Sequence, residues 1–102
     1  MSIILNKKMR RFDPGVFEIQ RKKISGKWKP VILCTINTRS LRFNKLKQLL
    51  PLISSRMLSQ CLKEMETNGI IERNENHYKT TDAGNTICLI LVNLNNEMSK
   101  LP

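Results

Sequence analysis

The feature that most constrains the fold is a pair of helix boundaries in the middle of the chain. A short helix is predicted from Asn44, its N-cap, to Leu50, and Pro51 stops it because a proline cannot continue a helix. Ser54 is a strong N-cap for a longer helix, which Gly69 ends by allowing a left-handed backbone. A tight turn separates the two helices. The sequence therefore predicts a helix-turn-helix unit.

A β-hairpin is predicted directly after this unit. Short strands at residues 70–73 and 77–80 are joined by the polar turn of residues 74–76. A hairpin in this position is the wing of a winged helix. The predicted fold class is therefore mainly α with a small β-hairpin (α+β), in a winged helix-turn-helix arrangement.

The remaining predicted elements flank the winged unit. They are helices at residues 14–24 and 28–37, an extended piece at Leu41 and Arg42, and a last helix from about residue 83 to residue 98, capped by Thr81 or Asp82. Residues 1–13 are basic and aperiodic, which indicates a flexible arm. No repeat or linker divides the rest, so we expect one winged-helix domain at residues 14–102.

The helix predicted at residues 54–68 has two chemically distinct faces. Its apolar side has the spacing of a core stripe and consists of Leu58, Cys61, Leu62 and Met65. Its polar side has no carboxylate and consists of Ser55, Arg56, Ser59, Gln60 and Lys63. Such hydroxyl, amide and cationic groups suit the base edges and phosphates of DNA. The alternative is an ordinary amphipathic helix with a solvated polar face.

We expect double-stranded DNA to contact this helix and its neighbours on both sides. In helix-turn-helix docking, the first turns of the second helix meet base edges, and flanking elements meet the backbone. The predicted DNA-binding residues are Arg42, Asn44, Lys45, Ser54, Ser55, Arg56, Ser59, Gln60, Lys63, Arg73 and Lys79. Glu64 and Glu66 come only toward the C-terminal end, which points away from the groove in this docking mode.

The charge distribution also favours a polyanionic partner. The formal net charge is +10, and residues 1–63 carry 15 basic and 2 acidic side chains, whereas residues 64–102 carry 3 and 6. This polarity fits a basic front that binds a polyanion and a neutral or acidic back. A solvated basic surface that binds nothing in particular is the alternative.

The last predicted helix is apolar nearly all round. Its apolar residues are Ile87, Cys88, Leu89, Ile90, Leu91, Val92 and Leu94. A monomer of this size cannot cover two apolar faces, so we expect a homodimer that forms through the terminal helices. The predicted interface residues are Phe17, Ile87, Ile90, Leu91, Leu94 and Met98. A fully buried C-terminal helix is the alternative.

Other functional classes find little support in the sequence. Three cysteines and one histidine lack the close spacing of zinc-ligand pairs, so neither a metal nor a cofactor is predicted. No phosphate-binding loop or nucleophile motif indicates an enzyme. No signal peptide or membrane-length apolar stretch is visible, so we expect a cytoplasmic protein without membrane contact. Cys61 lies on the core stripe, whereas Cys34 and Cys88 are candidates for exposed, redox-active thiols.

Five segments of the chain combine into one specific pattern. They are Gly26 to Pro30, Leu41 to Leu46, Ile53 to Leu62, Gly69 to Arg73, and Tyr78 to Gly84. In this order and spacing they resemble the HxlR family of winged-helix regulators. The resemblance implies a homodimer joined through the first and last helices. It also implies that the fourth helix lies in the major groove and the hairpin beside the minor groove.

Two departures from the family's pattern bear on function. Many members carry a redox-sensing cysteine at the start of the first helix, but the matching place here is near Gly15, and no cysteine precedes Cys34. We therefore do not expect thiol sensing at that position. The family's hairpin is usually longer and proline-rich, so this short wing is expected to touch phosphate through Arg73 or Lys79 rather than to insert deeply.

Two functional hypotheses remain at this point. The first is a sequence-specific regulator of transcription. The second is a winged helix that serves as a protein-interaction module, with its basic charge meeting an acidic partner. The polar side chains of Arg56, Ser59 and Gln60 favour the first hypothesis, because they suit base edges.

Overall fold

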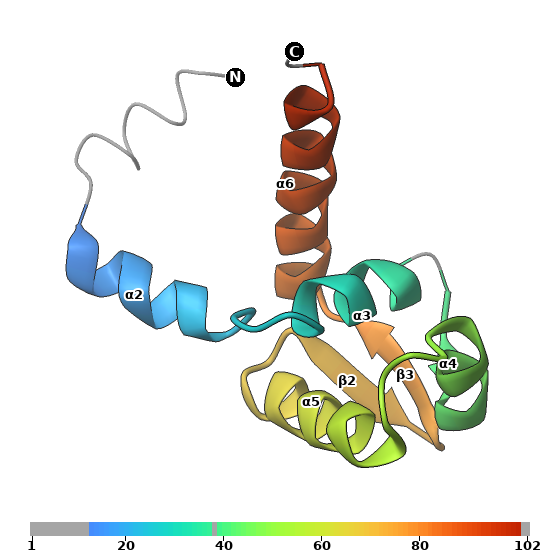
Figure 1. The fold of residues 1–102 in the computed structure, drawn as a ribbon. Helices are drawn as coiled ribbons and strands as arrows, with labels where there is room; N and C mark the ends of the chain where they lie inside the picture. The colour runs from blue at the N-terminus through green and yellow to red at the C-terminus, as the bar shows by residue number, and fades with distance from the viewer. Residues whose placement is uncertain (1–12, 38, 101–102) are drawn as a thin grey trace.

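The computed structural model describes residues 13–37 and 39–100 (Figure 1). Its elements, in chain order, are α2 (Pro14–Lys22), α3 (Lys29–Ile36), β1 (Leu41–Arg42), α4 (Phe43–Leu49), α5 (Ser55–Thr67), β2 (Ile71–Asn74), β3 (His77–Thr80) and α6 (Asp82–Met98). The described chain is mainly helical with one small antiparallel sheet, as predicted. The arm predicted at residues 1–13 lies outside the described residues except for Asp13.

The wing belongs to a sheet with the strand order β1-β3-β2. Strands β2 and β3 form the predicted hairpin, and the two loop residues, Glu75 and Asn76, have positive φ angles of 51° and 69°. Positive φ at both positions matches the twist of the paired strands. Strand β1 pairs antiparallel with β3, with Leu41 opposite Tyr78. The sequence predicts the extended piece at residues 41–42 but not this pairing.

The core lies between α3, α4, α5 and the sheet, and the start of α6 closes one end. Its buried residues are Ile32, Leu33, Ile36, Leu41, Leu46, Ile53, Leu58, Cys61, Leu62, Met65, Ile70, Ile71 and Cys88. The four residues predicted as the apolar stripe of α5 all belong to this set, which confirms the two-faced interpretation of that helix.

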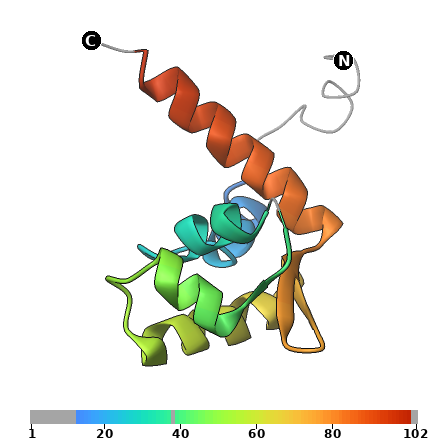
Figure 2. The same cartoon turned by 90° about the vertical axis from the view of Figure 1, so that its right-hand side faces the viewer.

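Two helices extend beyond this core (Figures 1 and 2). Helix α6 rises away from the sheet, and its buried residues, Gly84 and Cys88, both lie in its first half. Helix α2 projects on the other side, and its Val16 and Ile19 side chains are 53% and 61% exposed. Both helices therefore leave apolar surface uncovered.

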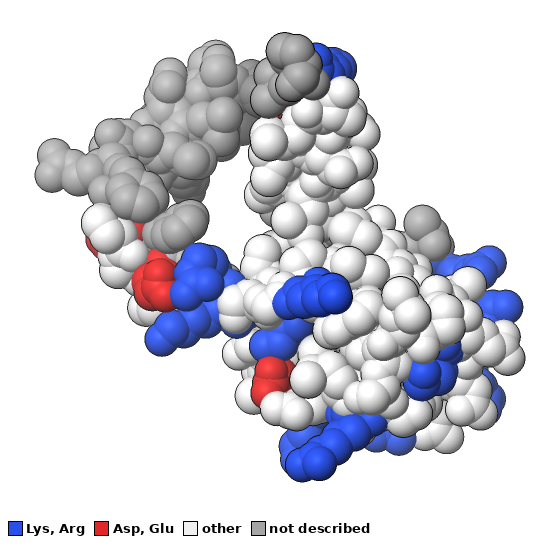
Figure 3. Space-filling view, viewed as in Figure 1, with Lys and Arg blue, Asp and Glu red and all other residues white. Residues whose placement is uncertain are grey.

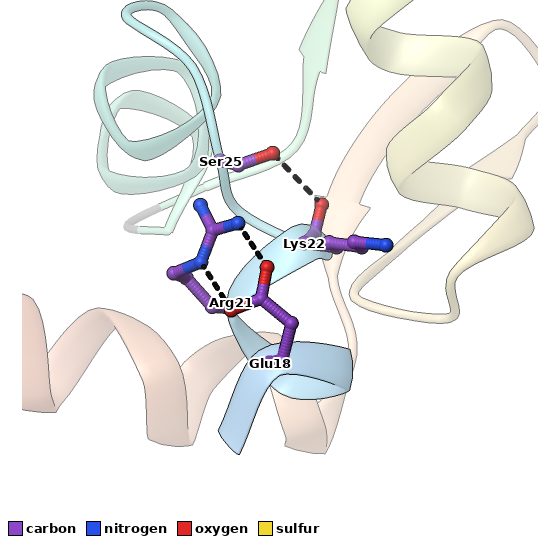
Figure 4. A network of polar contacts seen from close by, with 4 residues as sticks. All are labelled: Glu18, Arg21, Lys22 and Ser25. Carbon is purple, nitrogen blue, oxygen red and sulfur yellow. Dashed lines mark hydrogen bonds and ion pairs between the residues drawn. The ribbon is translucent and has the colours of Figure 1, made fainter. Parts of the chain in front are cut away.

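A local polar network closes the C-terminal end of α2 (Figure 4). Arg21 forms an ion pair with Glu18 one turn earlier, and Ser25 Oγ donates to the backbone oxygen of Lys22 at 3.2 Å. The hydrogen bond from Arg21 lowers the pKa of the Glu18 carboxyl. The positive charge of Arg21 is therefore balanced within α2.

Side-chain caps fix the starts of α5 and α6. Ser54 Oγ accepts a hydrogen bond from Met57 N at 3.0 Å, which confirms the predicted cap of α5. Thr81 Oγ1 accepts from Gly84 N at 3.1 Å and donates to Gly69 O at 2.7 Å. Thr81 therefore caps α6 and also ties it to the turn that follows α5.

Two local predictions are wrong. The N-cap of α4 is Arg42 rather than Asn44, because the pairing of β1 with β3 keeps the chain extended up to Arg42. Cys88 is not an exposed thiol: it is 2% exposed and belongs to the core, while Cys34 is half-buried against it.

Candidate nucleic-acid interface

The outer face of α5 presents the polar residues predicted for it. The side chains of Ser54, Ser55, Arg56, Ser59, Gln60 and Lys63 are all exposed, while the apolar stripe on the other side is at most 6% exposed. Met57, which is 42% exposed, adds an apolar group next to Arg56 that the sequence pattern does not place there. Hydroxyl, guanidinium and amide groups thus stand together with one thioether on the first turns of the helix.

The turn between α4 and α5 holds this face in position. Ile53 is 1% exposed, and its N–H donates to Leu50 O at 3.3 Å. Because the anchored Ile53 directly precedes the N-cap Ser54, the first turn of α5 is fixed to the core while its polar side chains remain outside. Leu52, at the tip of the turn, is 88% exposed.

An ionic network connects the outer face of α5 to α3. Glu64 accepts a hydrogen bond from Gln60 Nε2 at 3.2 Å through one carboxylate oxygen, and its other oxygen lies 2.7 Å from Lys29 Nζ. The hydrogen bonds from Lys29 and then from Gln60 lower the pKa of the Glu64 carboxyl. The carboxylate therefore stays ionised near neutral pH, where it fixes the orientation of the Gln60 amide.

A small hollow lies beside the loop end of the β2–β3 wing. It has a volume of about 180 Å³ and is lined by Arg42, Phe43, Asn44, Arg73, Asn76 and Tyr78. Arg73 Nη2 donates to Asn76 Oδ1 at 2.9 Å, and its guanidinium carbon lies 5.8 Å from the centre of the Tyr78 ring. Arg42 Nε donates to His77 Nε2 at 3.4 Å. Two arginines thus line one hollow whose lining residues include no carboxylate, a composition that suits a phosphate.

Three of the residues predicted to bind DNA, Arg42, Asn44 and Arg73, therefore meet in space although they come from three elements. Lys45 is exposed on α4 outside this hollow. Lys79 also lies apart from it, with its Nζ 3.3 Å from Glu72 Oε2 in a half-exposed ion pair. Such a surface pair contributes little to stability, so Lys79 can exchange its partner for a phosphate at small cost.

Besides Met57, sequence reasoning missed two contributors to this surface. Asn76 occupies a left-handed turn position, which its residue type favours, so the hairpin rules could have found it. Lys29 has no comparable signal, because its partner Glu64 is distant in the sequence and the contact exists only in the folded chain.

The residues predicted for a dimer interface divide into two groups. Ile87 and Leu91 are half-buried against the core of the same chain, whereas Ile90, Leu94 and Met98 are exposed. The side chain of Phe17 lies outside the part of the chain that is described. Lys and Arg side chains gather over the body that holds α4 and α5, while the α6 column is mostly uncharged (Figure 3).

The described ranges contain neither a candidate metal site nor a candidate membrane span. Within residues 13–37 and 39–100, no cluster of three or more His, Cys, Asp or Glu side chains is placed to hold a metal ion. No helix in these same ranges has the length and apolar character needed to cross a membrane.

The element order and the polar outer face of α5 define a winged helix-turn-helix protein. A family model described as HxlR-like helix-turn-helix matches residues 23–101, and the chain belongs to this family. The relatives that the chain matches are named as transcriptional regulators. The chain is therefore a member of a family of helix-turn-helix transcriptional regulators.

Two relatives illustrate the extent of the likeness. An uncharacterised HTH-type transcriptional regulator of Methanothermobacter thermautotrophicus is 41% identical over 56 residues, which are 55% of this chain and 43% of that protein. YkvN of Bacillus subtilis, described in the same way, is 32% identical over 93 residues, which cover 84% of this chain and 78% of YkvN. The match thus spans less than half of the archaeal relative and most of the bacterial one.

Solved structures share the fold. The crystal structure of the HTH-type transcriptional regulator YtcD, a Bacillus subtilis protein, gives a TM-score of 0.75 at 33% identity, covering 82% of this chain and 93% of that chain. Quinone-bound YodB from Bacillus subtilis gives a TM-score of 0.79 at 24% identity, covering 85% and 99%. At that identity, the likeness to YodB shows the fold alone.

Proposed function

We propose that this chain acts as a homodimer that regulates transcription by binding a specific site in double-stranded DNA. In this proposal, α5 lies in the major groove and the β2–β3 wing lies beside the minor groove. The observation that carries the proposal is the outer face of α5, where Arg56, Ser59 and Gln60 are exposed and the first carboxylate comes at Glu64.

The polar groups of α5 support base contacts. A guanidinium pairs with the two acceptors of guanine, an amide pairs with adenine, and a hydroxyl serves either base. Arg56 and Ser59 occupy the first turns of the helix, the part that meets base edges in helix-turn-helix docking. Lys63 follows further along and is proposed to bind phosphate, together with Ser54 and Ser55 at the start of the helix.

The hollow beside the loop end of the wing supports a backbone contact. Arg42 and Arg73 both line it, and a phosphate seated there could receive hydrogen bonds from both guanidinium groups. The proposed backbone contacts are therefore Arg42, Asn44 and Arg73, with Lys45 and Lys79 at their flanks. Because the wing loop contains only Glu75 and Asn76, it is proposed to rest on the minor-groove edge without inserting.

The uncovered apolar surface supports a dimer. Ile90, Leu94 and Met98 are 61%, 55% and 57% exposed along one side of α6, and α2 adds exposed Val16 and Ile19. Exposed apolar residues in such number on a small chain indicate an interaction site. We propose that a second copy covers it, since a two-fold dimer would present two α5 helices to the two halves of a palindromic site.

Selection of bound DNA from a random pool tests the proposal. We expect a palindromic site whose halves lie about one helical turn, roughly 34 Å, apart, and light scattering should give a dimer mass at tens of micromolar protein. If the dimer neutralises about 6–10 phosphates, affinity should fall by roughly 10³–10⁵ between 50 and 200 mM salt.

Two outcomes would count against this function. A flat response to salt would remove the DNA-binding role of the basic surface. Equal affinity for the selected site, for scrambled DNA and for an acidic polypeptide would favour the other hypothesis, a protein-interaction module with an acidic partner.

A further inference from the structure

The fold brings two cysteines from distant parts of the chain into contact. Cys34 lies in α3 and Cys88 in α6, 54 residues apart in the sequence, and their sulfur atoms are 3.3 Å apart. Cys88 is 2% exposed, whereas Cys34 is half-buried. The third cysteine, Cys61, is buried on α5, and the Cys34–Cys88 pair is the one thiol–thiol contact in the described part of the chain.

Cys34 can be reached from solvent through a hollow between α3 and α6. The hollow has a volume of about 370 Å³ and is lined by Pro30, Val31, Cys34, Leu91, Val92 and Asn95. Its lining is apolar except for Asn95 and the thiol, and it contains no charged side chain. A small uncharged reagent can therefore reach Cys34. The Cys88 sulfur is buried in the core, in contact with the Cys34 sulfur.

We propose that Cys34 and Cys88 form a reversible disulfide within one chain when a hydroperoxide oxidises Cys34. This inference goes beyond DNA binding and does not depend on it. A disulfide has a sulfur–sulfur distance of about 2.0 Å, so the two sulfur atoms need to approach by little more than 1 Å. Adjustment of the two side chains and a small shift of the helices supply a movement of that size.

The reaction runs in two steps. The Cys34 sulfur attacks the terminal oxygen of the hydroperoxide, the O–O bond breaks, and the products are a sulfenic acid on Cys34 and an alcohol. The Cys88 sulfur then attacks the Cys34 sulfur, and the sulfenic oxygen leaves as water. Each cysteine gives up one electron and one proton, and the hydroperoxide takes up the two electrons and two protons, so one disulfide, one alcohol and one water result.

The environment of Cys34 determines the rate. Burial, followed by the hydrogen bond that the thiol shares with Cys88, raises the pKa of the Cys34 thiol to about 11. The thiolate is the reacting form and is scarce at neutral pH, so oxidation is slow and needs prolonged exposure to excess hydroperoxide. The pair therefore forms its disulfide only under sustained oxidation and does not act as a fast sensor.

The disulfide would join the projecting helix α6 to the winged unit. Helix α6 is buried only near its start, and Cys88 is one of its two buried residues. A covalent bond to α3 closes a long loop and restricts the unfolded chain, so the oxidised protein should melt higher, on the order of 10 °C above the reduced protein.

Oxidation of the full-length protein tests the proposal. The protein is treated with cumene hydroperoxide at neutral pH for hours and then with N-ethylmaleimide. Mass spectrometry should show a chain that has lost two hydrogen atoms and takes one maleimide, whereas the reduced protein takes three under denaturing conditions. Peptide mapping should place the disulfide between Cys34 and Cys88 and the maleimide on Cys61. Dithiothreitol should restore all three thiols and the lower melting temperature.

Two variants separate this disulfide from other products. Cys34→Ser removes the half-buried cysteine of the pair. After treatment with oxidant, Cys88 of this variant should remain a reduced thiol that can be alkylated, and the melting temperature should not rise. Cys61→Ser is the matched control and should still form the bond. If Cys34→Ser fails to fold, the peptide map of the parent still decides. Covalent dimers, a bond to Cys61, or three free thiols after the full exposure would overturn the proposal.

Discussion

Lys29 Nζ lies 2.7 Å from Glu64 Oε1, and this ion pair joins the first residue of α3 to the outer face of α5. The Lys29 side chain is 11% exposed and that of Glu64 is 45% exposed, so the pair is shielded on one side. Because Glu64 also accepts from Gln60, a contact between two helices controls the position of a proposed base-reading amide. The ion pair therefore connects the packing of α3 against α5 to the placement of Gln60, a proposed DNA contact.

The ion pair predicts a specific loss of stability in acid. The lowered pKa of Glu64 means that the folded state favours the carboxylate, so its contribution to stability is present above the unfolded value of 4.5 and is lost as pH falls through the lower folded pKa. Thermal melts of the parent between pH 6 and pH 3 should therefore show a steeper decline than those of Glu64→Gln.

Glu66→Gln is the matched control for this experiment. Glu66 is exposed on the same helix and takes no part in the contact with Lys29. This variant should keep the parent's steep decline in acid. Identical pH profiles for the parent and Glu64→Gln would mean that the ion pair does not form in solution.

Arg56 and Lys63 should respond differently to removal, since the proposal assigns them different DNA groups. Arg56→Ala should cost about 1–3 kcal/mol per half-site and relax the preference at one base pair, while nonspecific binding stays nearly intact. Lys63→Ala should weaken all sequences alike and reduce the salt slope by about one for each lost phosphate contact. Affinities for the selected site and for scrambled DNA, measured at several salt concentrations, decide between these patterns. Parent-like affinity of Arg56→Ala for the selected site would refute the assigned reading face.

The sequence predicted the elements whose signals are local. Ser54 is the N-cap of α5, and Gly69 follows the C-cap Asn68 with a left-handed φ of 77°. The apolar and polar faces of α5 follow from its helical period, so its exposed residues could be assigned without a structure. The pairing of β1 with β3 could not be assigned, because two residues, Leu41 and Arg42, have too little periodicity to show a partner.

The parts of the site that depend on tertiary contacts were beyond sequence reasoning. The hollow at the wing needs Arg42 and Arg73 to meet across the sheet, and each residue alone is an ordinary surface cation. The contact between Cys34 and Cys88 likewise depends on how α6 crosses α3, which no spacing rule encodes. Local patterns therefore located α5, the proposed reading helix, but packing determined which other side chains meet.

Gly84 in α6 should tolerate no side chain. A Cβ at this position would lie 2.0 Å from the backbone oxygen of Ile70 and 3.0 Å from its carbonyl carbon, and neither atom can move without shifting the chain. Gly84→Ala should therefore lower the free energy of unfolding by about 2–3 kcal/mol, measured by urea denaturation. Gly15→Ala is the control: its added Cβ would make only an ordinary 3.4 Å contact with Asp13, so the change should stay small. A parent-like Gly84→Ala would show that α6 does not pack this closely.

Leu94 tests the proposed dimer surface. It is 55% exposed on α6, so Leu94→Lys should leave the monomer folded. If a second copy covers this position, the lysine must be buried unpaired, and the dimer dissociation constant should rise by about 100-fold or more. Asn96→Lys adds the same charge at an exposed position on the other side of the helix and should stay dimeric. Light scattering and sedimentation at micromolar protein measure the dimer dissociation constants of both variants. A dimer unaffected by Leu94→Lys would place the interface elsewhere.

Oxidation should have little effect on DNA affinity. The position near Gly15 carries no cysteine, and neither Cys34 nor Cys88 belongs to the outer face of α5 or to the hollow at the wing. Closing the proposed disulfide moves the two sulfur atoms by little more than 1 Å, and these atoms belong to α3 and α6 rather than to α5, which carries the proposed base-reading side chains. The dissociation constant for the selected site should therefore change by less than about threefold after treatment with diamide or hydroperoxide, which corresponds to less than about 0.7 kcal/mol. The same result is expected for the parent and for a variant with all three cysteines replaced by serine. Release of the parent from DNA by oxidant, with no release of the triple variant, would show instead that these thiols control DNA binding.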